Sequence, residues 1–324
     1  MSETRRLTAP TELAGLRLDV ALTRLAADLS RARIQRLLVG GHVLVGGRAV
    51  KPSARLRGGE EVVLTLPDPE PSGLLAQDLP LQVLSEDRDL LVLDKAAGMV
   101  VHPARGTPHS TVVNALLHRL GEASAPGERL GLVHRLDKET SGCLLIAKTR
   151  FAATELTGSF RHRSARKIYW ALVAGVPKPK QGRISTYLAK EESEDDSIMR
   201  VAKHGDEGAS HAVTYYAVVE TSAQKLAWVS LKPVTGRTHQ LRAHMAHIDH
   251  AIVGDPKYFN KENWQLPGGL QNRLHLLARR IVIPHPRGGV IDASAPLPPH
   301  MLQSWNLLGL EHDRFDPIEN APEE

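Results

Sequence analysis

The chain has 324 residues, of which 42% are hydrophobic and 24% are charged, a composition typical of globular proteins. This excludes a wholly disordered or collagen-like chain, and the single cysteine, Cys143, excludes an internal disulfide and suits a reducing compartment. The net charge is +5, but residues 311–324 hold six acids against one arginine, so residues 1–310 carry +10 and favour a polyanionic partner.

The sequence predicts no targeting or membrane-spanning segment. The N-terminus, Met-Ser-Glu-Thr-Arg-Arg, is not followed by the apolar core of a signal peptide. No apolar run approaches the roughly 18 residues needed to span a bilayer. We therefore expect a cytoplasmic protein that is not bound to membranes.

Residues 13–66 are expected to form a small unit of their own. Apolar side chains at helical spacing up to Leu29 predict a first helix. Ser30 suits the N-cap of a second helix, and the glycines at positions 40 and 41 would end it. The strands expected after these helices are a hairpin at 42–50 and a further strand at 61–66.

This unit carries a cluster of positive charge. Between Leu29 and Gly59 there is no acidic residue, but there are seven basic ones. A solvated surface usually mixes both signs, so we interpret the cluster as a phosphate-binding surface. Because no aromatic residue precedes Phe151, this unit has no ring on which a base could stack. The residues expected to bind RNA are Arg31, Arg33, Arg36, Lys51 and Arg55.

A proline-rich linker at 67–80 is expected to lead to a larger domain at 81–310, followed by an acidic C-terminal tail at 311–324. In the larger domain, strands and helices follow one another without regular βαβ alternation. This favours an α+β fold with a large mixed sheet that is mostly antiparallel. The expected elements are strands at 81–84, 90–93, 144–147, 168–173, 213–219, 226–231 and 280–283, and helices at 112–120 and 238–248.

Three segments of the larger domain carry side chains suited to catalysis. In residues 131–142, an apolar strand delivers an arginine and an aspartate into a turn rich in hydroxyl groups. In residues 167–173, Tyr169 alternates with apolar neighbours. Residues 231–244 read as a strand and a turn that lead into a helix.

These segments resemble the signature motifs of the RluA-type pseudouridine synthases. The resemblance covers about residues 80–300 and is specific, because several independent motifs occur in the family's order. The unit at 13–66 resembles the S4-like RNA-binding domain of the RluC/RluD branch, which modifies large-subunit ribosomal RNA. The matching motifs are H-R-L-D-x-x-T-S-G at 134–142, K-x-Y-x-A-L-V at 167–173, G-R-T-H-Q-L-R-x-H at 236–244, V-G-D-P-K-Y at 253–258, and a variant of K-P-x-G-x-x-V-H-P at 95–103.

The resemblance implies an enzyme that detaches a uracil base within RNA, rotates it and rejoins it through carbon 5, without a cofactor. Asp137 matches the family's catalytic aspartate, whose carboxylate can attack the ribose, attack the uracil ring or assist removal of a ribose proton. Each role needs an ionised carboxylate, and because desolvation in a closed pocket would raise its pKa, a fixed cation is needed to oppose the shift. Arg242 matches the family arginine that pairs with this aspartate, and a guanidinium can hold a carboxylate by two parallel hydrogen bonds.

Other positions of these motifs also imply roles at the substrate. Tyr169 matches the tyrosine that stacks on the target base, and we favour stacking over proton transfer because a phenol of pKa about 10 is a poor base. Arg135 matches a residue that inserts where the uridine has left the helix, since a paired base must be extruded to react. His134 is either a general acid or, as we favour, an orienting or structural group. The remaining residues expected at the substrate are Arg237, His239 and Gln240.

Other chemistries match less of the sequence. Four histidines at 239–250 could suggest zinc, but no cysteine and few acids lie nearby at ligand spacing, so we expect no metal. Ser141 lacks the G-x-S-x-G context of a hydrolase nucleophile. Asp137 with Glu139 resembles a glycosidase pair, which would also act on sugars but with a different outcome.

Two positions depart from the family pattern. Ala96 replaces the usual proline after Lys95, and this change is expected to loosen a turn without affecting the chemistry. Leu277 stands where the family usually has a histidine, while His275 lies two residues earlier. The second departure puts the shape of one pocket wall in question.

Together these observations predict a cytoplasmic pseudouridine synthase that acts on large-subunit ribosomal RNA as a monomer, without an obligatory protein partner. One alternative is the same chemistry on transfer RNA, because the choice of target depends on loop shapes. A second alternative is a non-catalytic RNA-binding or ribosome-assembly factor that keeps the fold. The intact set of Asp137, Tyr169 and Arg242 argues against this second alternative.

Overall fold

The computed structural model describes residues 3–26, 29, 31–67, 74–104, 106–121, 131–192, 197–260, 262 and 267–322. It divides the chain into two compact units, Met1–Gly73 and Leu74–Glu324. Of the expected features, Ser30 and residues 68–73 of the linker lie outside the described residues. None of the helices in the described ranges is long and apolar enough to cross a membrane.

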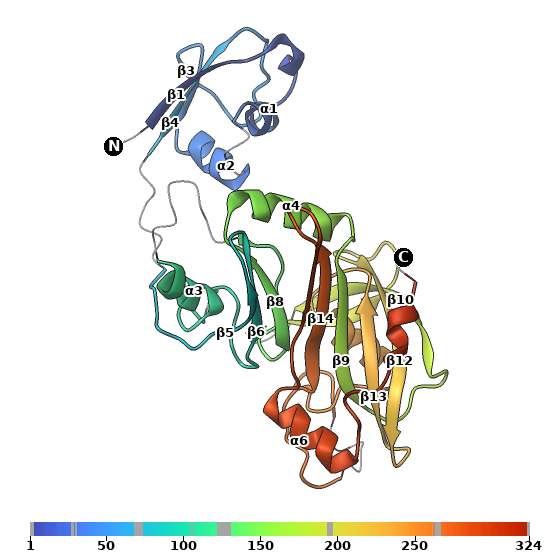
Figure 1. Cartoon of the computed structure of the whole chain (residues 1–324). Helices are drawn as coiled ribbons and strands as arrows, with labels where there is room; N and C mark the ends of the chain where they lie inside the picture. The colour runs from blue at the N-terminus through green and yellow to red at the C-terminus, as the bar shows by residue number, and fades with distance from the viewer. Residues whose placement is uncertain are drawn as a thin grey trace. The chain divides into compact units, whose positions relative to one another are not determined.

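The N-terminal unit packs two helices against a sheet whose order is β1-β4-β2-β3 in the described residues, with antiparallel neighbours (Figure 1). Its buried core includes Leu18, Leu22, Ile34 and Leu64. Both helices, the hairpin and the last strand confirm the predictions, although β1 precedes the predicted unit at 13–66 and was missed. The elements are β1 (Glu3–Thr8), η1 (Thr11–Leu13), α1 (Leu18–Leu25), α2 (Arg31–Val39), β2 (Val43–Val45), β3 (Arg48–Ala49) and β4 (Glu61–Leu66).

The larger unit is built on a sheet of 11 strands in the described part of the chain, with the order β11-β10-β12-β13-β9-β14-β8-β6-β5. Strand β15 pairs with β14, and β7 pairs with β8. Its named strand pairs are antiparallel except for β14 with β8. The strands are β5 (Gln82–Glu86), β6 (Leu90–Lys95), β7 (Gly131–Leu132), β8 (Ser141–Ala147), β9 (Arg166–Ala174), β10 (Gln181–Glu192), β11 (Ser197–Ala202), β12 (Ser210–Ser222), β13 (Leu226–Pro233), β14 (Leu276–Pro284) and β15 (Val290–Ser294).

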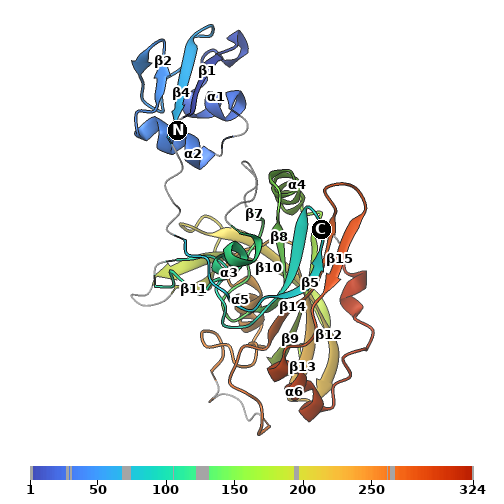
Figure 2. The ribbon, with the colours of Figure 1, turned by 60° about the vertical axis from the view of Figure 1, so that its left-hand side comes forward.

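Helices cover both faces of this sheet. Along β8, Cys143, Leu145 and Ala147 enter a core cluster with α4 and α6, whereas Leu144 and Ile146 enter another with α3. Because both faces are covered, every residue of β8 is buried and its sequence carries no charged residue and is apolar from Cys143 to Ala147. Helix α5 lies on the same face as α3 (Figure 2). These elements are α3 (Val112–Leu120), α4 (Arg150–Arg161), α5 (Gln240–His247), α6 (Pro299–Leu308) and the short η3 (Pro317–Asn320).

Gly142 makes the parallel contact in this sheet possible. It has a φ of 107°, a conformation that side-chain-bearing residues rarely adopt. A Cβ at this position would also lie 2.3 Å from the carbonyl oxygen of Ala278 on β14. The glycine that ends the first motif is therefore needed for β8 to approach β14.

The acidic segment 311–324, predicted as a separate tail, instead packs against the sheet in its described part. Trp170 Nε1 and Ser230 Oγ donate hydrogen bonds to Asp316 over 2.9 and 2.7 Å. Ile318 is 1% exposed and belongs to the same core cluster as α6. The prediction was wrong here because counting acids did not show that basic and polar side chains of the sheet would hold them.

The other predicted strands and helices of the larger unit are confirmed, with bounds that differ by a few residues. Six of the α-helices and strands in the described residues were not predicted from the sequence. Helix α4, for example, contains Gly158 in its interior, and its N-cap is Thr149, whose side chain accepts a hydrogen bond from Ala152 N. The elements that the sequence did not predict are β1, α4, β10, β11, β15 and α6.

Candidate active site

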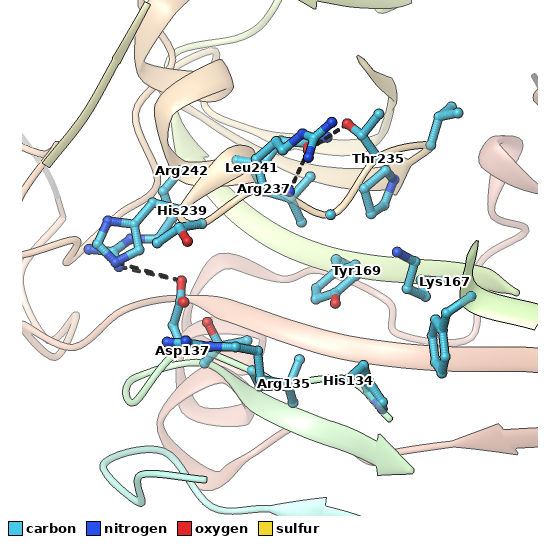
Figure 3. A pocket seen from close by; sticks show the side chains of 18 of the residues that line it. His134, Arg135, Asp137, Lys167, Tyr169, Thr235, Arg237, His239, Leu241 and Arg242 are labelled. Carbon is cyan, nitrogen blue, oxygen red and sulfur yellow. Dashed lines mark hydrogen bonds and ion pairs between the residues drawn. The ribbon is translucent and has the colours of Figure 1, made fainter. Parts of the chain in front are cut away.

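A pocket of about 660 Å³ opens where the core clusters under α3 and α5 meet at Tyr169 (Figure 3). One wall is the loop before β8, another is the turn before α5, and β9 crosses between them. The structure brings together all eight residues that were predicted at the active site, although they are spread over more than a hundred positions. They are His134, Arg135, Asp137, Tyr169, Arg237, His239, Gln240 and Arg242.

Asp137 stands in the turn before β8, and buried Lys95 at the end of β6 holds this turn. The Nζ of Lys95 donates to the carbonyl oxygens of Ala96, Met99 and Lys138 over 2.8, 2.9 and 3.0 Å. An ammonium group has three protons, so its hydrogen-bonding capacity is fully used. Burial lowers the pKa of Lys95 to about 8, so the group still carries its charge at neutral pH. The loop at 95–103 thereby fixes the residue that follows Asp137.

The carboxylate of Asp137 is open to the pocket. Its side chain is 22% exposed, and its Oδ2 lies 3.6 Å from Nη1 of Arg242 and 3.9 Å from Nε2 of His239. Within the described ranges, no group donates a hydrogen bond to either oxygen. The carboxylate is therefore near positive charge while its lone pairs remain available for reaction.

Arg242 was expected to hold Asp137 by two parallel hydrogen bonds. The structure shows that its guanidinium instead holds Asp255 in this way. Nε and Nη2 of Arg242 donate to Oδ2 and Oδ1 of Asp255, both over 2.7 Å. The two side chains are 4% and 0% exposed. Burial alone would lower the pKa of Arg242, but the hydrogen bonds and charge of Asp255 outweigh burial and raise it. Only Nη1 is left to face Asp137.

Asp255 is a site residue that the sequence did not single out. It also accepts hydrogen bonds from the backbone nitrogens of Lys257 and Tyr258, over 2.9 and 3.2 Å. Before it, Gly254 has a φ of 72°, and a Cβ there would lie 2.0 Å from the carbonyl oxygen of Arg273. The V-G-D-P-K-Y motif therefore builds a tight turn that aims Asp255 at the guanidinium.

His239 lies between Asp137 and Tyr258. Its backbone is left-handed, with a φ of 48°, at the N-terminal end of α5. Its Nδ1 lies 3.3 Å from the hydroxyl of Tyr258, which also accepts a hydrogen bond from Met199 N over 2.8 Å. Burial lowers the pKa of His239 and raises that of Tyr258 to about 12, so both are neutral near pH 7.

The pKa values of Tyr169 and His134 are shifted by burial, and the shifts bear on the roles predicted for the two residues. Burial, reinforced by the charge of Asp137, raises the pKa of Tyr169 above its usual value, which disfavours a role as a base and leaves stacking. His134 Nε2 accepts a hydrogen bond from Leu145 N over 2.8 Å, and its ring stacks on that of Phe160. Burial lowers the pKa of His134 to about 3. A neutral ring bonded to β8 suits the structural role that we favoured.

Gln240 was predicted to contact the substrate, but its side-chain amide is bound within the protein. Its Oε1 accepts from Thr235 Oγ1 and Arg237 N, and its Nε2 donates to Val213 O and Thr214 Oγ1. These four bonds, between 2.6 and 3.0 Å long, use the full capacity of the amide. Gln240 therefore holds the turn before α5 instead of presenting its amide to a ligand.

Two predicted arginines are exposed at the pocket. Arg135 has no hydrogen-bond or ion-pair partner among the described residues. Arg237 donates from Nε to His211 O over 3.1 Å. A further basic residue, Lys167, also lines the pocket, although it was quoted only as a motif letter.

The second departure from the family pattern, at Leu277, has a structural account. Leu277 is fully buried in the core, and its neighbour Leu276 lines the pocket instead. His275 is also fully buried, with Nδ1 at 2.7 Å from Arg273 O and Nε2 at 2.7 Å from Ser304 Oγ on α6. The leucine therefore leaves the pocket wall intact, and the nearby histidine anchors α6.

The histidines at 239–250 do not gather into a metal site. His244 lies 2.9 Å from Thr214 Oγ1 and 3.0 Å from Thr186 Oγ1, and His250 Nδ1 donates to Ala174 O. Within the parts of the chain that the structure describes, no group of three or more His, Cys, Asp or Glu side chains could hold a metal ion.

The residues predicted to bind RNA lie in the N-terminal unit, away in sequence from the pocket. Arg36, Lys51 and Arg55 are exposed, and Arg33 on α2 is half-buried. Arg55 also donates from Nη1 to the carbonyl oxygen of Gly15. The side chain of Arg31 lies outside the described part of the structure.

The chain is similar to known RNA pseudouridine synthases over most of its length. A family model for RNA pseudouridylate synthase matches residues 89–247, and one for the S4 domain matches residues 16–62. An uncharacterized RNA pseudouridine synthase of Synechocystis sp. is 36% identical, with 88% of this chain and 87% of that protein covered. Ribosomal large subunit pseudouridine synthase D of Pseudomonas aeruginosa is 35% identical, with 96% and 98% covered. The solved structure of human RNA Pseudouridylate Synthase Domain Containing 4 has a TM-score of 0.58 at 27% identity and covers 71% of this chain and 94% of that chain.

Proposed function

This chain belongs to the RNA pseudouridine synthases, and from that premise we propose that it converts uridine to pseudouridine in large-subunit ribosomal RNA, with Asp137 as its catalytic carboxylate. The observation that carries the assignment of Asp137 is its geometry. Its carboxylate faces a pocket that also contains Tyr169, has free lone pairs, and lies 3.6 Å from a fixed guanidinium. The reaction is an isomerisation, so the proposal includes no external cofactor.

The pocket suits a nucleoside that has left its helix. Tyr169 offers a neutral aromatic face on which a uracil can stack. Exposed Arg135 at the rim, without a partner among the described residues, can occupy the space that the base vacates. The carboxylate of Asp137 then meets either the anomeric carbon, the uracil ring or a ribose proton.

The substrate class is supported by charge and by relatives. The N-terminal unit presents exposed basic side chains, which give phosphate contacts of low sequence specificity. Relatives named ribosomal large subunit pseudouridine synthase D align with 93–98% of this chain, including its N-terminal unit. The proposal includes a monomer that acts without an obligatory protein partner.

The assay is release of tritium from uridine labelled at carbon 5. Purified protein is incubated with labelled transcripts of large-subunit ribosomal RNA, small-subunit ribosomal RNA and transfer RNA. The proposal predicts release from the large-subunit RNA. Release from transfer RNA alone would move the target to the alternative class, and binding without release from any RNA would favour the non-catalytic alternative. Mapping pseudouridines in cells with and without the gene then identifies the modified positions.

A further inference from the structure

Lys167 is a cation in the pocket that none of the roles above uses. It lies on β9 two residues before Tyr169, so both side chains project from the same face of the strand. Its Nζ would lie 3.9 Å from a Cβ built on Gly236, which places the ammonium beside the turn before α5. Figure 3 shows Tyr169 between Asp137 and Lys167.

The ammonium group of Lys167 has no protein partner within the described ranges. No hydrogen bond or ion pair to it occurs there, although buried and half-buried charges in proteins are normally paired. Burial lowers its pKa to about 8, so it is mainly charged at neutral pH. The other charged or titratable groups that line the pocket include a single acid, and they are His134, Arg135, Asp137, Arg161, Arg163, Tyr169, Arg237, His239 and Arg242.

The reaction creates negative charge on the base by every route that is open for Asp137. If the C1′–N1 bond breaks, its electron pair stays with the uracil, and the anion is shared among N1, O2 and O4. The ribose is then balanced by a bond from the Asp137 carboxylate to C1′ or by transfer of the C2′ proton to it. If the carboxylate instead adds to C6 of the ring, the electron pair moves to an enolate at O4. In each case the C1′–N1 bond is broken, C5 finally bonds to C1′, the C5 proton leaves and N1 gains a proton. The carboxylate is set free at the same time, because its bond to C1′ or C6 breaks or because it returns the proton to C2′.

We propose that Lys167 is a further catalytic residue that stabilises this negative charge by contacting the uracil carbonyl oxygen farthest from the ribose. This inference rests on the proposed function. With the ribose at Asp137 and the ring on Tyr169, the end of the base farthest from the ribose points toward Lys167. Before the rotation, O4 lies at this end. Rotation that brings C5 to the place of N1 exchanges C2 with C4, so O2 then occupies that end. One fixed cation therefore serves both halves of the reaction, in the manner of a preorganised charge at a developing oxyanion.

The test compares Lys167→Met, Lys167→Arg and a matched control, Lys225→Met. Met keeps the length of the side chain without the charge, Arg keeps the charge, and Lys225 is exposed in the turn between β12 and β13, outside the pocket. Three quantities are measured for each variant: the single-turnover rate at saturating enzyme, the RNA Kd and the dependence of Kd on salt. Thermal denaturation checks that each variant is folded, and Lys167→Gln replaces Lys167→Met if the latter is not.

We expect Lys167→Met to lower the saturated rate by about 100-fold, the usual effect of removing one donor to an oxyanion, with Kd changed less than about twofold. Lys167→Arg should keep at least about a tenth of the rate, and Lys225→Met should behave as the wild type. An unchanged saturated rate would overturn the proposal. So would a weaker Kd with a shallower salt dependence and a normal rate, because that result would make Lys167 a phosphate contact. If the wild type releases no tritium from any RNA, the proposed function fails; if it is active and Lys167→Met is equally active, only this inference fails.

Discussion

Replacing Asp255 by asparagine removes the charge that holds Arg242 in place. The guanidinium is bound by two hydrogen bonds of 2.7 Å to a carboxylate that is 0% exposed. Asparagine keeps the shape and one acceptor but leaves a buried guanidinium whose nearest acid is Asp137, at 3.6 Å. We expect Arg242 to turn toward Asp137 and to engage the oxygens that the reaction needs.

The effect of burial on stability can be separated from the effect of hydrogen-bond geometry. A second arginine–aspartate pair has the same two-bond geometry but is more exposed. Arg280 binds Asp292 through Nε and Nη2 over 2.7 and 2.6 Å, but these side chains are 33% and 45% exposed. Breaking a buried pair costs about 3–5 kcal/mol, whereas an exposed pair is worth about 1 kcal/mol or less. Since asparagine retains one acceptor, we expect Asp255→Asn to cost about 3 kcal/mol and Asp292→Asn less than about 1 kcal/mol.

The assay is urea unfolding followed by tryptophan fluorescence, which reports the larger unit alone because all four tryptophans lie after residue 169. Single-turnover tritium release is measured in parallel under conditions where each variant is folded. We expect Asp255→Asn to lower the rate by at least about 10-fold and Asp292→Asn to leave it unchanged. Equal destabilisation by the two variants, together with a normal rate for Asp255→Asn, would refute the claim that burial of this fork positions Arg242.

Three further predictions concern other parts of the chain. Lys95→Met removes the three hydrogen bonds that hold the turn of Asp137, so the saturated rate should fall by about 10-fold or more while RNA Kd is unchanged; a normal rate would contradict the positioning role. Burial lowers the pKa of His244 and His275 to about 4 from the unfolded value near 6.5, so the unfolded state takes up protons first and stability is lost as pH falls from about 6.5 toward 4. Between pH 7 and 5, each of these histidines should lower the free energy of unfolding by about 2 kcal/mol. The His275→Gln variant should therefore lose about 2 kcal/mol less than the wild type over this range. An equally steep loss in that variant would contradict the buried, neutral state of His275. In the N-terminal unit, alanine in place of Arg31, Arg33 and Arg36 removes expected phosphate contacts. RNA binding should therefore weaken, and the slope of log K against log salt should fall by about 2. An unchanged slope would contradict the RNA-binding role of these arginines.

Much of the fold was predictable from apolar patterning. Strand β8 and helix α3 have continuous or periodic apolar residues and clear ends, and both lie where the sequence placed them. By contrast, β10 and β11 have polar and mixed sequences that lack a period, and their pairing depends on partners distant in the chain. The acidic segment after residue 310 shows the same limit, because its burial depends on Trp170, Ser230 and other residues of the sheet.

The membership of the candidate site was predictable, but the direction of its side chains was not. The motif resemblance gathered Asp137, Tyr169 and Arg242 correctly into one pocket. Spacing could not show that the fork of Arg242 binds Asp255, 13 residues away, instead of Asp137. It also could not show that the amide of Gln240 is fully used within the protein. Both outcomes depend on side-chain orientation, which only the packed structure determines.

The role of Asp137 is tested most directly by the Asp137→Asn variant in single-turnover tritium release from large-subunit ribosomal RNA. Asparagine has nearly the same shape but cannot act as an anionic nucleophile or base at neutral pH. The account predicts that release is abolished while the RNA Kd remains within about twofold of the wild type, because phosphate contacts dominate affinity. Release at the wild-type rate by this variant would contradict the account.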